Sequence, residues 1–243
     1  MTEGLDGRIV LVTGANGGLG EEFVRQALAR GAAKVYATAR SPRQWDDDRI
    51  VPLVLDLTDA DSIVAAAATA SDVDLLVNNA AIAPAADSSI AAADDDLLRS
   101  VFETNVIGTI RVSGAFAPVL ARNGGGAVLS VLSLAAWTPL PTVYAVSKAA
   151  ALSATNGLRT ELAAQGTTVT GVLVGMVDTA MGARFDVPKV SPASVVAQAY
   201  DGAVTGAFEV LADDDTRMVK GLLSRPAEDL AAVTAAAMQA ISA

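Results

Sequence analysis

Short runs of β-branched and other apolar residues alternate along this chain with longer segments rich in alanine and leucine. Nearly continuous apolar runs are typical of strands buried on both faces, and their alternation with helices indicates a parallel sheet. The runs that predict strands are residues 9–12, 34–39, 51–55, 73–77, 127–132, 168–174 and 208–211. We therefore expect an α/β fold, in which a doubly wound parallel sheet of about seven strands carries helices on both faces.

The segments between these runs predict the helices. They cover residues 20–30, 59–70, 94–122 as one or two helices, 142–164, and the segments that begin at positions 191 and 226. Either Asp59 or Thr58 can cap its helix, and the acidic residues that begin with Asp94 can cap another, because negative charge stabilises the N-terminal end of a helix. No internal repeat or linker divides the sequence, so residues 1–243 are expected to form one domain.

The charge of the chain excludes some classes of partner. A net charge of −10 argues against nucleic acid and against anionic lipid, since both require a surface rich in lysine and arginine. The first residues lack the basic stretch and apolar core of a signal peptide, and no apolar run approaches the ~20 residues that span a membrane. We expect a cytoplasmic protein that binds neither nucleic acid nor membrane.

The absence of histidine and cysteine restricts the chemistry further. It excludes a Ser-His-Asp triad, a thiolate nucleophile and metal sites built from these residues, and no metal site is expected. Proton transfer would then fall to tyrosine, lysine or a carboxylate. Tyr144 and Lys148 are four residues apart on a predicted helix and share one face. A lysine in that place would lower the pKa of the tyrosine, so this pair is the candidate proton donor and acceptor.

A glycine-rich loop follows the first predicted strand and opens the first helix. It reads Thr13-Gly-Ala-Asn-Gly-Gly-Leu-Gly20. Glycines let the backbone turn sharply and approach a diphosphate, and the helix N-terminus offers free N–H groups. An ordinary strand–helix turn is the alternative, but the place at the start of a βαβ unit favours dinucleotide binding. The residues expected to bind are Gly14, Asn16, Gly17, Gly18, Leu19 and Gly20.

The spacing of Gly14, Gly18 and Gly20, together with Tyr144-x-x-x-Lys148, resembles the compact single-domain branch of the short-chain dehydrogenase/reductase family. The resemblance spans residues 7–179. It implies a Rossmann-like fold, a nicotinamide cofactor, and the interconversion of ketones or aldehydes and alcohols by a short-chain alcohol dehydrogenase or carbonyl reductase.

The resemblance also implies two further catalytic residues. Asn105, in Asn105-Val-Ile-Gly108, matches a helix residue of the proton relay, and Ser133 matches the serine that binds the reacting oxygen. Ser130 competes with Ser133 for this role. The alternation of side chains along a strand turns the two to opposite faces, so only one can serve.

Other matching segments imply cofactor contacts. Asn79-Ala80-Ala81 resembles the family's Asn-Ala-Gly, and residues 175–179 resemble its Gly-x-x-x-Thr, although Val174 stands where the family has proline. Asp56 matches the carboxylate that binds adenine; a strand-end or helix-capping aspartate is the alternative. The cofactor-binding residues implied in this way are Asp56, Leu57, Asn79, Ala80, Ala81, Gly175, Val177 and Thr179, with Tyr144 and Lys148.

The end of the second predicted strand indicates the form of the cofactor. A carboxylate there would accept from the 2′-hydroxyl of NAD and repel a 2′-phosphate. This chain has Ala39 in that position, followed by Arg40, whose guanidinium suits a phosphate. We predict NADP(H) as the cofactor, with Arg40 as the main determinant and Ser41 or Arg43 as helpers.

The expected substrate is a small, neutral and largely apolar carbonyl or alcohol compound. The residues that can form apolar walls are Trp137, Leu140, Met176, Met181 and Phe185. A homodimer through the helices around residues 98–120 and 143–162 is expected rather than a tetramer, because the chain lacks the family's usual C-terminal tail. Two alternatives stay open: an epimerase or dehydratase on the same fold, and a non-catalytic NADP-binding sensor or scaffold.

Overall fold

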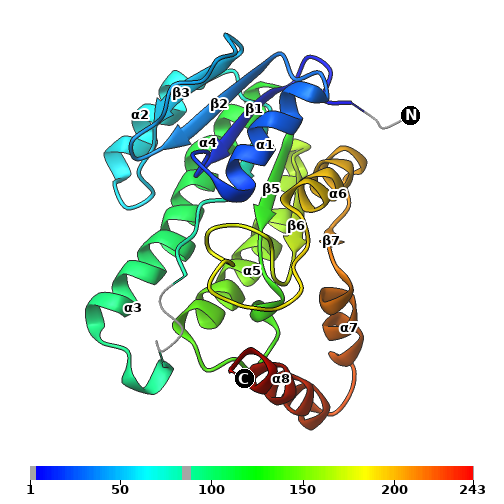
Figure 1. Cartoon of the computed structure of the whole chain (residues 1–243). Coiled ribbons are helices and arrows are strands. Elements are labelled where there is room, and N and C mark those ends of the chain that lie inside the picture. The colour runs from blue at the N-terminus through cyan, green and yellow to red at the C-terminus, as the bar shows by residue number, and fades with distance from the viewer. Residues whose placement is uncertain (1–3, 84–88, 243) are drawn as a thin grey trace.

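The computed structural model of the chain describes residues 4–83 and 89–242. Seven parallel strands form one sheet in the order β3-β2-β1-β4-β5-β6-β7 (Figure 1). The strands are β1 (Ile9–Thr13), β2 (Lys34–Ala39), β3 (Ile50–Val54), β4 (Leu75–Asn78), β5 (Ala127–Val131), β6 (Thr168–Leu173) and β7 (Glu209–Leu211). The predicted doubly wound, Rossmann-like α/β fold is confirmed, and each predicted strand is present with its ends moved by at most two residues.

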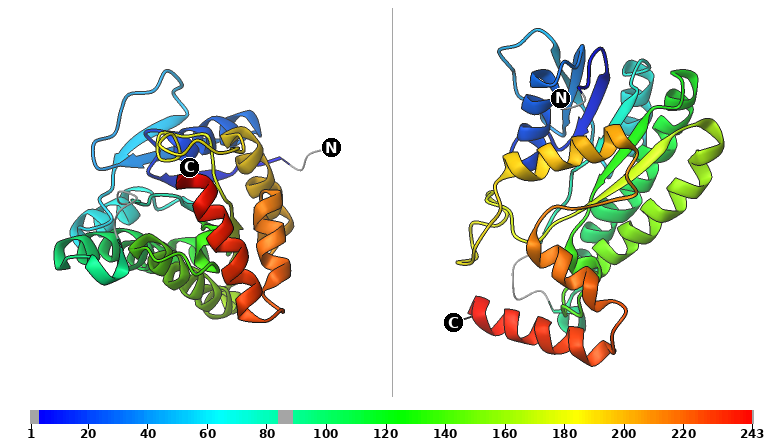
Figure 2. Two further views of the ribbon diagram at one scale, coloured as in Figure 1. Left: turned by 60° about the horizontal axis from the view of Figure 1, so that its bottom comes forward. Right: turned by 90° about the vertical axis from the view of Figure 1, so that its right-hand side faces the viewer.

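Helices cover both faces of this sheet (Figure 2). They are α1 (Gly18–Ala29), α2 (Ala60–Thr69), α3 (Asp95–Phe102), α4 (Thr109–Arg122), α5 (Val143–Leu162), α6 (Pro192–Thr205), α7 (Asp214–Leu222) and α8 (Ala227–Ser242). Asp59, not Thr58, caps α2, accepting from Asp61 N at 2.9 Å and Ser62 N at 3.2 Å. Asp94 caps α3 as predicted.

The alternation of side chains along the central strands divides the core into two layers. Val10 and Val12 of β1 pack on one face, with Phe23 of α1 and Tyr200 of α6. Leu11 faces the other way, into the layer that α2, α4 and α5 cover. Both faces of β1 are therefore buried, which explains why its sequence is apolar without interruption.

The predicted helical segment 94–122 divides into α3 and α4, which are joined by a π-helical turn (Glu103–Gly108). Gly108 lies close to the chain after β3: a Cβ added to it would come within 2.5 Å of the Leu57 carbonyl oxygen. The turn thus brings the helix against the carboxyl end of the sheet, and π-helical turns of this kind are frequent at functional sites.

The direction of winding reverses between β1 and β4, where the carboxyl ends of two adjacent strands diverge. Ligands bind at such a switch point in open parallel sheets. The Thr13 hydroxyl joins the ends of β1 and β4 at this point. It donates to Val77 O at 3.2 Å and accepts from Asn79 N at 2.9 Å and Ala80 N at 3.0 Å. The fold therefore fixes where the loop after β1 begins.

Gly20 is the position where this loop packs most tightly, and it generates the first prediction. A Cβ added to Gly20 would lie 2.0 Å from Gly14 O and 2.8 Å from Asn79 Nδ2. We expect Gly20→Ala to lower the free energy of unfolding by about 2 kcal/mol, as overpacking of a core does. Urea denaturation measures the change.

Gly114→Ala is the matched control, since a Cβ on that exposed residue of α4 has nothing within 4 Å. Alanine there should leave the stability unchanged or raise it. Equal stabilities for the two variants would contradict the packing argument.

Candidate active site

The N-terminus of α1 has no side-chain cap in the part of the chain that the structure describes. By contrast α2, α3, α5, α6 and α7 each begin with a capping aspartate, threonine or serine. Gly17, the residue that immediately precedes α1, has open space around it, since an added Cβ would meet nothing within 4 Å. Free N–H groups next to open space fit a diphosphate, as the sequence predicts.

Two glycines of this loop adopt backbone angles that other residues rarely take. Gly14 has φ +67° and Gly18 has φ +57°. An added Cβ at Gly14 would lie 3.0 Å from Ala80 Cα, and one at Gly18 would lie 3.5 Å from Thr179 Cγ2. The glycine-rich loop is therefore adjacent both to the end of β4 and to the loop after β6, as a shared cofactor site requires.

Asn16 joins the glycine-rich loop to the segment after β2. Its Nδ2 donates to Ser41 O at 2.8 Å, and its Oδ1 accepts from Arg43 N at 3.4 Å. Arg43 is already engaged by its side chain, in an ion pair with Glu21 at 2.8 Å and in a stack 3.9 Å above the Trp45 ring. Leu19, another non-glycine residue of the loop, packs against the core.

Arg40 differs from Arg43 because its guanidinium is exposed and, within residues 4–83 and 89–242, makes no hydrogen bond or ion pair. Its charge acts on Asp56. The pKa of Asp56 lies below its usual value, first because the Thr58 N–H donates to the carboxylate at 2.9 Å, and also because Arg40 is nearby. Asp56 and the buried Leu57 thus lie beside the arginine that the sequence singles out for a phosphate.

The side chain of Asn79 supports the backbone of the glycine-rich loop. Its Nδ2 donates to Thr13 O at 2.8 Å and to Gly14 O at 3.3 Å. Ala80 packs against Gly14, and Ala81 continues to Ile82. In the structure these residues hold the backbone of the site, which is consistent with the expected place beside the cofactor.

Asn105 lies in the π-helical turn and is buried, with 3% of its surface exposed. Its amide is fully used: Oδ1 accepts from Ile82 N at 2.8 Å, and Nδ2 donates to Ile82 O at 2.9 Å and to Ser147 Oγ at 3.0 Å. Ser147 Oγ in turn donates to Tyr144 O at 2.7 Å. Sequence reasoning missed Ser147, although it stands inside the Tyr144-x-x-x-Lys148 motif.

Ser133, Tyr144 and Lys148 meet at the carboxyl end of β5. Ser133 directly follows this strand, accepts from Ala135 N at 3.1 Å, and is hydrogen-bonded to the Tyr144 hydroxyl. Lys148 Nζ lies 5.6 Å from the centroid of the Tyr144 ring and donates to Val131 O at 3.1 Å. Ser130 is turned away: its Oγ is buried and has no partner among the described residues.

Burial shifts the pKa values of this cluster in opposite directions. It raises the pKa of Tyr144 to about 12, against the hydrogen bond from Ser133, and lowers the pKa of Lys148 to about 8. The sequence-based expectation of a lowered tyrosine pKa is therefore wrong for the protein's own groups. Loss of water disfavours both charged forms, and the Lys148 ammonium is directed at the Val131 carbonyl oxygen rather than at the phenol.

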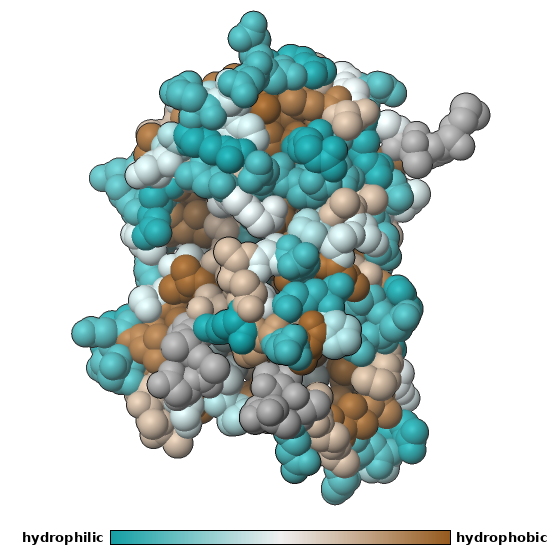
Figure 3. Space-filling view, in the orientation of Figure 1, coloured by the Kyte–Doolittle hydropathy of each residue, from teal (hydrophilic) through white to brown (hydrophobic). Residues whose placement is uncertain are grey.

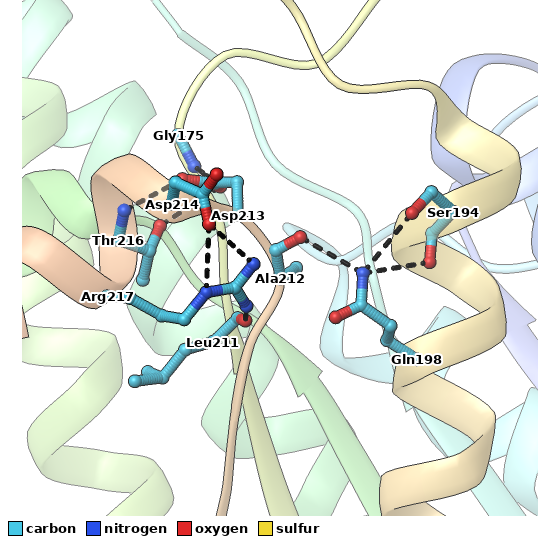
Figure 4. Close-up of polar contacts among 9 residues, drawn as sticks. All are labelled: Gly175, Ser194, Gln198, Leu211, Ala212, Asp213, Asp214, Thr216 and Arg217. Carbon is cyan, nitrogen blue, oxygen red and sulfur yellow. Dashed lines mark hydrogen bonds and ion pairs between the residues drawn. The ribbon is translucent and has the colours of Figure 1, made fainter.

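The loop after β6 closes the site on its other side. The backbone of Val177 pairs with Val190, and Thr179 N donates to Val177 O at 2.9 Å. The loop begins at Gly175, whose N–H donates to Asp213 Oδ2 at 2.6 Å (Figure 4). Asp213 is a second residue that sequence reasoning missed; its only signal is its place at the start of an acidic run before a helix.

These residues fit a nicotinamide dinucleotide. Open backbone at Gly17 suits the diphosphate, exposed Arg40 suits a further phosphate, and the cluster around Tyr144 lies across the switch point from them. Within the described ranges, no three or more acidic side chains are grouped so that they could hold a metal ion. None of the helices described is long and apolar enough to cross a membrane.

The lowered pKa of Lys148 generates a prediction about stability. Between about pH 8 and 10.5 the unfolded chain binds one more proton than the folded protein, so the stability from this group rises with pH across that window. Relative to Lys148→Met, the wild type should gain up to about 3 kcal/mol in the free energy of unfolding, at 1.36 kcal/mol for each pKa unit. Urea denaturation without nucleotide at both ends of the window measures it. A difference that stays constant with pH would contradict the assignment.

Comparison with known proteins identifies the family of the chain. The sequence model of the short chain dehydrogenase family matches residues 8–188. The crystal structure of a short chain dehydrogenase from Burkholderia cenocepacia J2315 in complex with NADP superposes with a TM-score of 0.87 at 35% identity, covering 94% of this chain and 98% of that one.

Two curated proteins are similar at lower coverage. Dehydrogenase/reductase SDR family member 4 of Bos taurus is 31% identical over 72% of this chain and 67% of its own length. The 3-oxoacyl-(acyl-carrier-protein) reductase of Vibrio harveyi is 31% identical over 73% of this chain and 76% of its own length. With the fold and the motifs in place, these matches confirm the resemblance, and the chain belongs to the short-chain dehydrogenase/reductase family of oxidoreductases.

Proposed function

We propose that this protein is an NADP(H)-dependent oxidoreductase that interconverts ketones or aldehydes and the corresponding alcohols. The observation that carries the proposal is the cluster at the end of β5, where the Tyr144 hydroxyl is hydrogen-bonded to Ser133 and Lys148 lies against the same ring. Tyr144 is an acid near the carboxyl end of β5 that has a hydroxyl group, that of Ser133, beside it. That arrangement suits proton transfer to a carbonyl oxygen.

In the reducing direction each residue has one task. The nicotinamide, when bound, supplies a hydride, which forms the new C–H bond at the carbonyl carbon. Tyr144 gives its phenolic proton to the carbonyl oxygen as the C–O double bond opens, and Ser133 donates a hydrogen bond to that oxygen while negative charge develops on it. With its pKa raised to about 12, the Tyr144 phenol is protonated at neutral pH and so carries the proton that reduction requires.

Lys148 and Asn105 are assigned to the return of the proton. With its pKa lowered to about 8, Lys148 exchanges a proton readily near neutral pH. Asn105 lies behind the cluster and is linked to α5 through Ser147. We assign to these residues the resupply of the Tyr144 hydroxyl after each turnover.

The preference for NADP(H) rests on Arg40 and on the lack of an acidic residue at Ala39. Among the described residues near the glycine-rich loop, Arg40 has an exposed guanidinium with no ion pair, whereas Arg43 is paired with Glu21. A planar guanidinium binds phosphate oxygens strongly. The NADP complex of the Burkholderia relative supports the same choice.

The substrate we propose is neutral and largely apolar. Met181 is 45% exposed and Phe185 is half-buried in the segment after Thr179, and Trp137 follows the turn after Ser133. Figure 3 shows hydrophobic residues in several separate groups over the upper and lower parts of the face that Figure 1 presents, with hydrophilic residues between them. Lys220 contacts the Trp137 ring, and its charge is balanced by Glu209 at 2.7 Å.

A homodimer fits the surface of α4 and α5. Ile110 of α4, Val146 of α5 and Ile107 of the adjoining π-helical turn are each more than a third exposed. Burying such side chains against a second copy is favourable. Light scattering of the purified protein would measure its mass in solution.

Tyr144→Phe tests the proposed reaction. The variant should bind NADPH as the wild type does but lose about 100-fold or more in kcat, since a positioned general acid contributes on that scale. NADPH oxidation against a panel of aromatic, cyclic and aliphatic ketones measures turnover, and quenching of protein fluorescence measures binding.

Tyr36→Phe is the matched control for this variant. Its hydroxyl donates to Asp72, in the turn before β4 at the amino ends of the strands, so its removal should leave kcat unchanged. Full activity of Tyr144→Phe would refute the assignment. NADPH binding without turnover of any ketone by the wild type would instead favour a sensor.

Arg40→Asp tests the choice of cofactor. A carboxylate there repels the 2′-phosphate and can accept from the 2′-hydroxyl, so the ratio of kcat/KM for NADPH over NADH should fall by about 100-fold. Arg122→Asp, at the far end of α4, makes the same change of charge away from the site and should leave the ratio unchanged. A retained preference for NADPH in Arg40→Asp would remove Arg40 from the explanation.

A further inference from the structure

A single peptide group at the start of the loop after β6 is held from both sides. The carbonyl oxygen of Val174 accepts from Leu134 N at 3.0 Å, and the N–H of Gly175 donates to Asp213 Oδ2 at 2.6 Å. The first bond comes from the turn that follows Ser133, and the second comes from the start of α7. The plane of this peptide is therefore fixed between the catalytic segment and the C-terminal part of the fold.

Asp213 is unlike the other aspartates that cap helices in this chain. Its carboxylate is buried, with 7% of the residue exposed, whereas Asp59 and Asp94 cap α2 and α3 from exposed positions. It accepts from Thr216 N at 2.7 Å and Thr216 Oγ1 at 3.0 Å, besides Gly175 N. A cap alone does not require burial, and burying a carboxylate is costly unless several donors compensate it.

The backbone around Asp213 is itself held by neighbouring elements (Figure 4). Gln198 of α6 donates through Nε2 to Ala212 O at 3.0 Å, and Ala212 N donates to Leu173 O at 2.9 Å. Arg217 donates to the carbonyl oxygen of Leu211. The carboxylate of Asp213 is thus a fixed point from which the loop after β6 departs.

The direction in which the loop leaves this point decides where Thr179 lies. Only three residues separate Gly175 from Thr179, and Thr179 Cγ2 lies against the start of α1 at Gly18. Met176 O also accepts from Val190 N at 2.9 Å, which limits how far the loop can move. An added Cβ on Gly175 would lie 3.0 Å from Leu134 Cδ2, so glycine permits the close approach of the loop to the turn after Ser133.

We propose that Asp213 is a positioning residue of the cofactor site, which holds the Gly175–Thr179 loop in the orientation that binds the nicotinamide half of NADP(H). The start of α7 thereby belongs to the active site, although it lies outside the residues 8–188 that the family model matches. The proposal rests on the proposed function for the identity of the ligand.

Asp213→Ser separates this role from capping. Serine caps a helix about as well as aspartate but is too short to reach Gly175 N, so α7 should remain folded while the bond to the loop is lost. We expect the Kd for NADPH to rise about tenfold, the scale of one hydrogen bond to a charged acceptor, and kcat to fall. Adenosine 2′,5′-bisphosphate, which lacks the nicotinamide half, should bind with an unchanged Kd.

Asp214→Ser is the matched control. Asp214 is the next residue and is exposed, where it pairs with Arg217 at 3.0 Å and does not contact the loop. Both ligands should bind this variant as they bind the wild type. Titration calorimetry of the wild type and the two variants with each ligand measures the six dissociation constants. An equal loss for both ligands in Asp213→Ser, or no loss for either, would overturn the proposal.

Amide hydrogen exchange tests the positioning role of Asp213 without any ligand. Amide exchange in residues 175–179, followed by mass spectrometry without nucleotide, should be faster in Asp213→Ser than in the wild type and unchanged in Asp214→Ser. Unaltered exchange in Asp213→Ser would refute the positioning role even if the protein proved to bind a different cofactor. Faster exchange with no NADPH turnover by the wild type would refute only the proposed function.

Discussion

The hydroxyl of Thr13 fastens the end of β1 to the end of β4, and the ordered segments of the site extend from that junction. One path leads through the Asn79 side chain to the glycine-rich loop. The other follows the chain from Ala80 to Ile82, which the amide of Asn105 holds on both sides, and continues through Ser147 to α5. Few of these bonds join residues close in sequence, so the site forms only when the sheet has assembled.

Burial, more than ion pairing, determines the protonation states of Tyr144 and Lys148 in this site. Lys148 has no carboxylate beside it in the part of the chain that the structure describes; its ammonium is directed at a backbone carbonyl. The phenol of Tyr144 shares a hydrogen bond with a neutral hydroxyl. Neutral forms of both side chains are favoured as a result, which means that a bound charged ligand would change the proton affinity of the cluster strongly.

The parts of the fold that the sequence predicted are those governed by local pattern. Buried parallel strands have uninterrupted apolar sequences, and the four-residue spacing of Tyr144 and Lys148 needs only a helix to bring them together. The π-helical turn at Asn105 was not predicted, because it accompanies a tertiary contact, the close approach of Gly108 to Leu57, that no local pattern reveals. Asp213 was missed for the same reason, since its bond to Gly175 spans 38 residues. The sign of the Tyr144 pKa shift depends on burial, which a helical spacing does not reveal.

The missing side-chain cap of α1 has a thermodynamic meaning. In α2, α3, α5, α6 and α7 the first turn is stabilised by an aspartate, threonine or serine of the chain itself. The first turn of α1 has no such side chain among the described residues, so its N–H groups are open to an anion from solution. Since such an anion binds the folded turn and not the unfolded one, its concentration sets part of the stability of the first βαβ unit. A bound anion would thus stabilise the N-terminus of α1 in the way that a capping side chain stabilises the other helices.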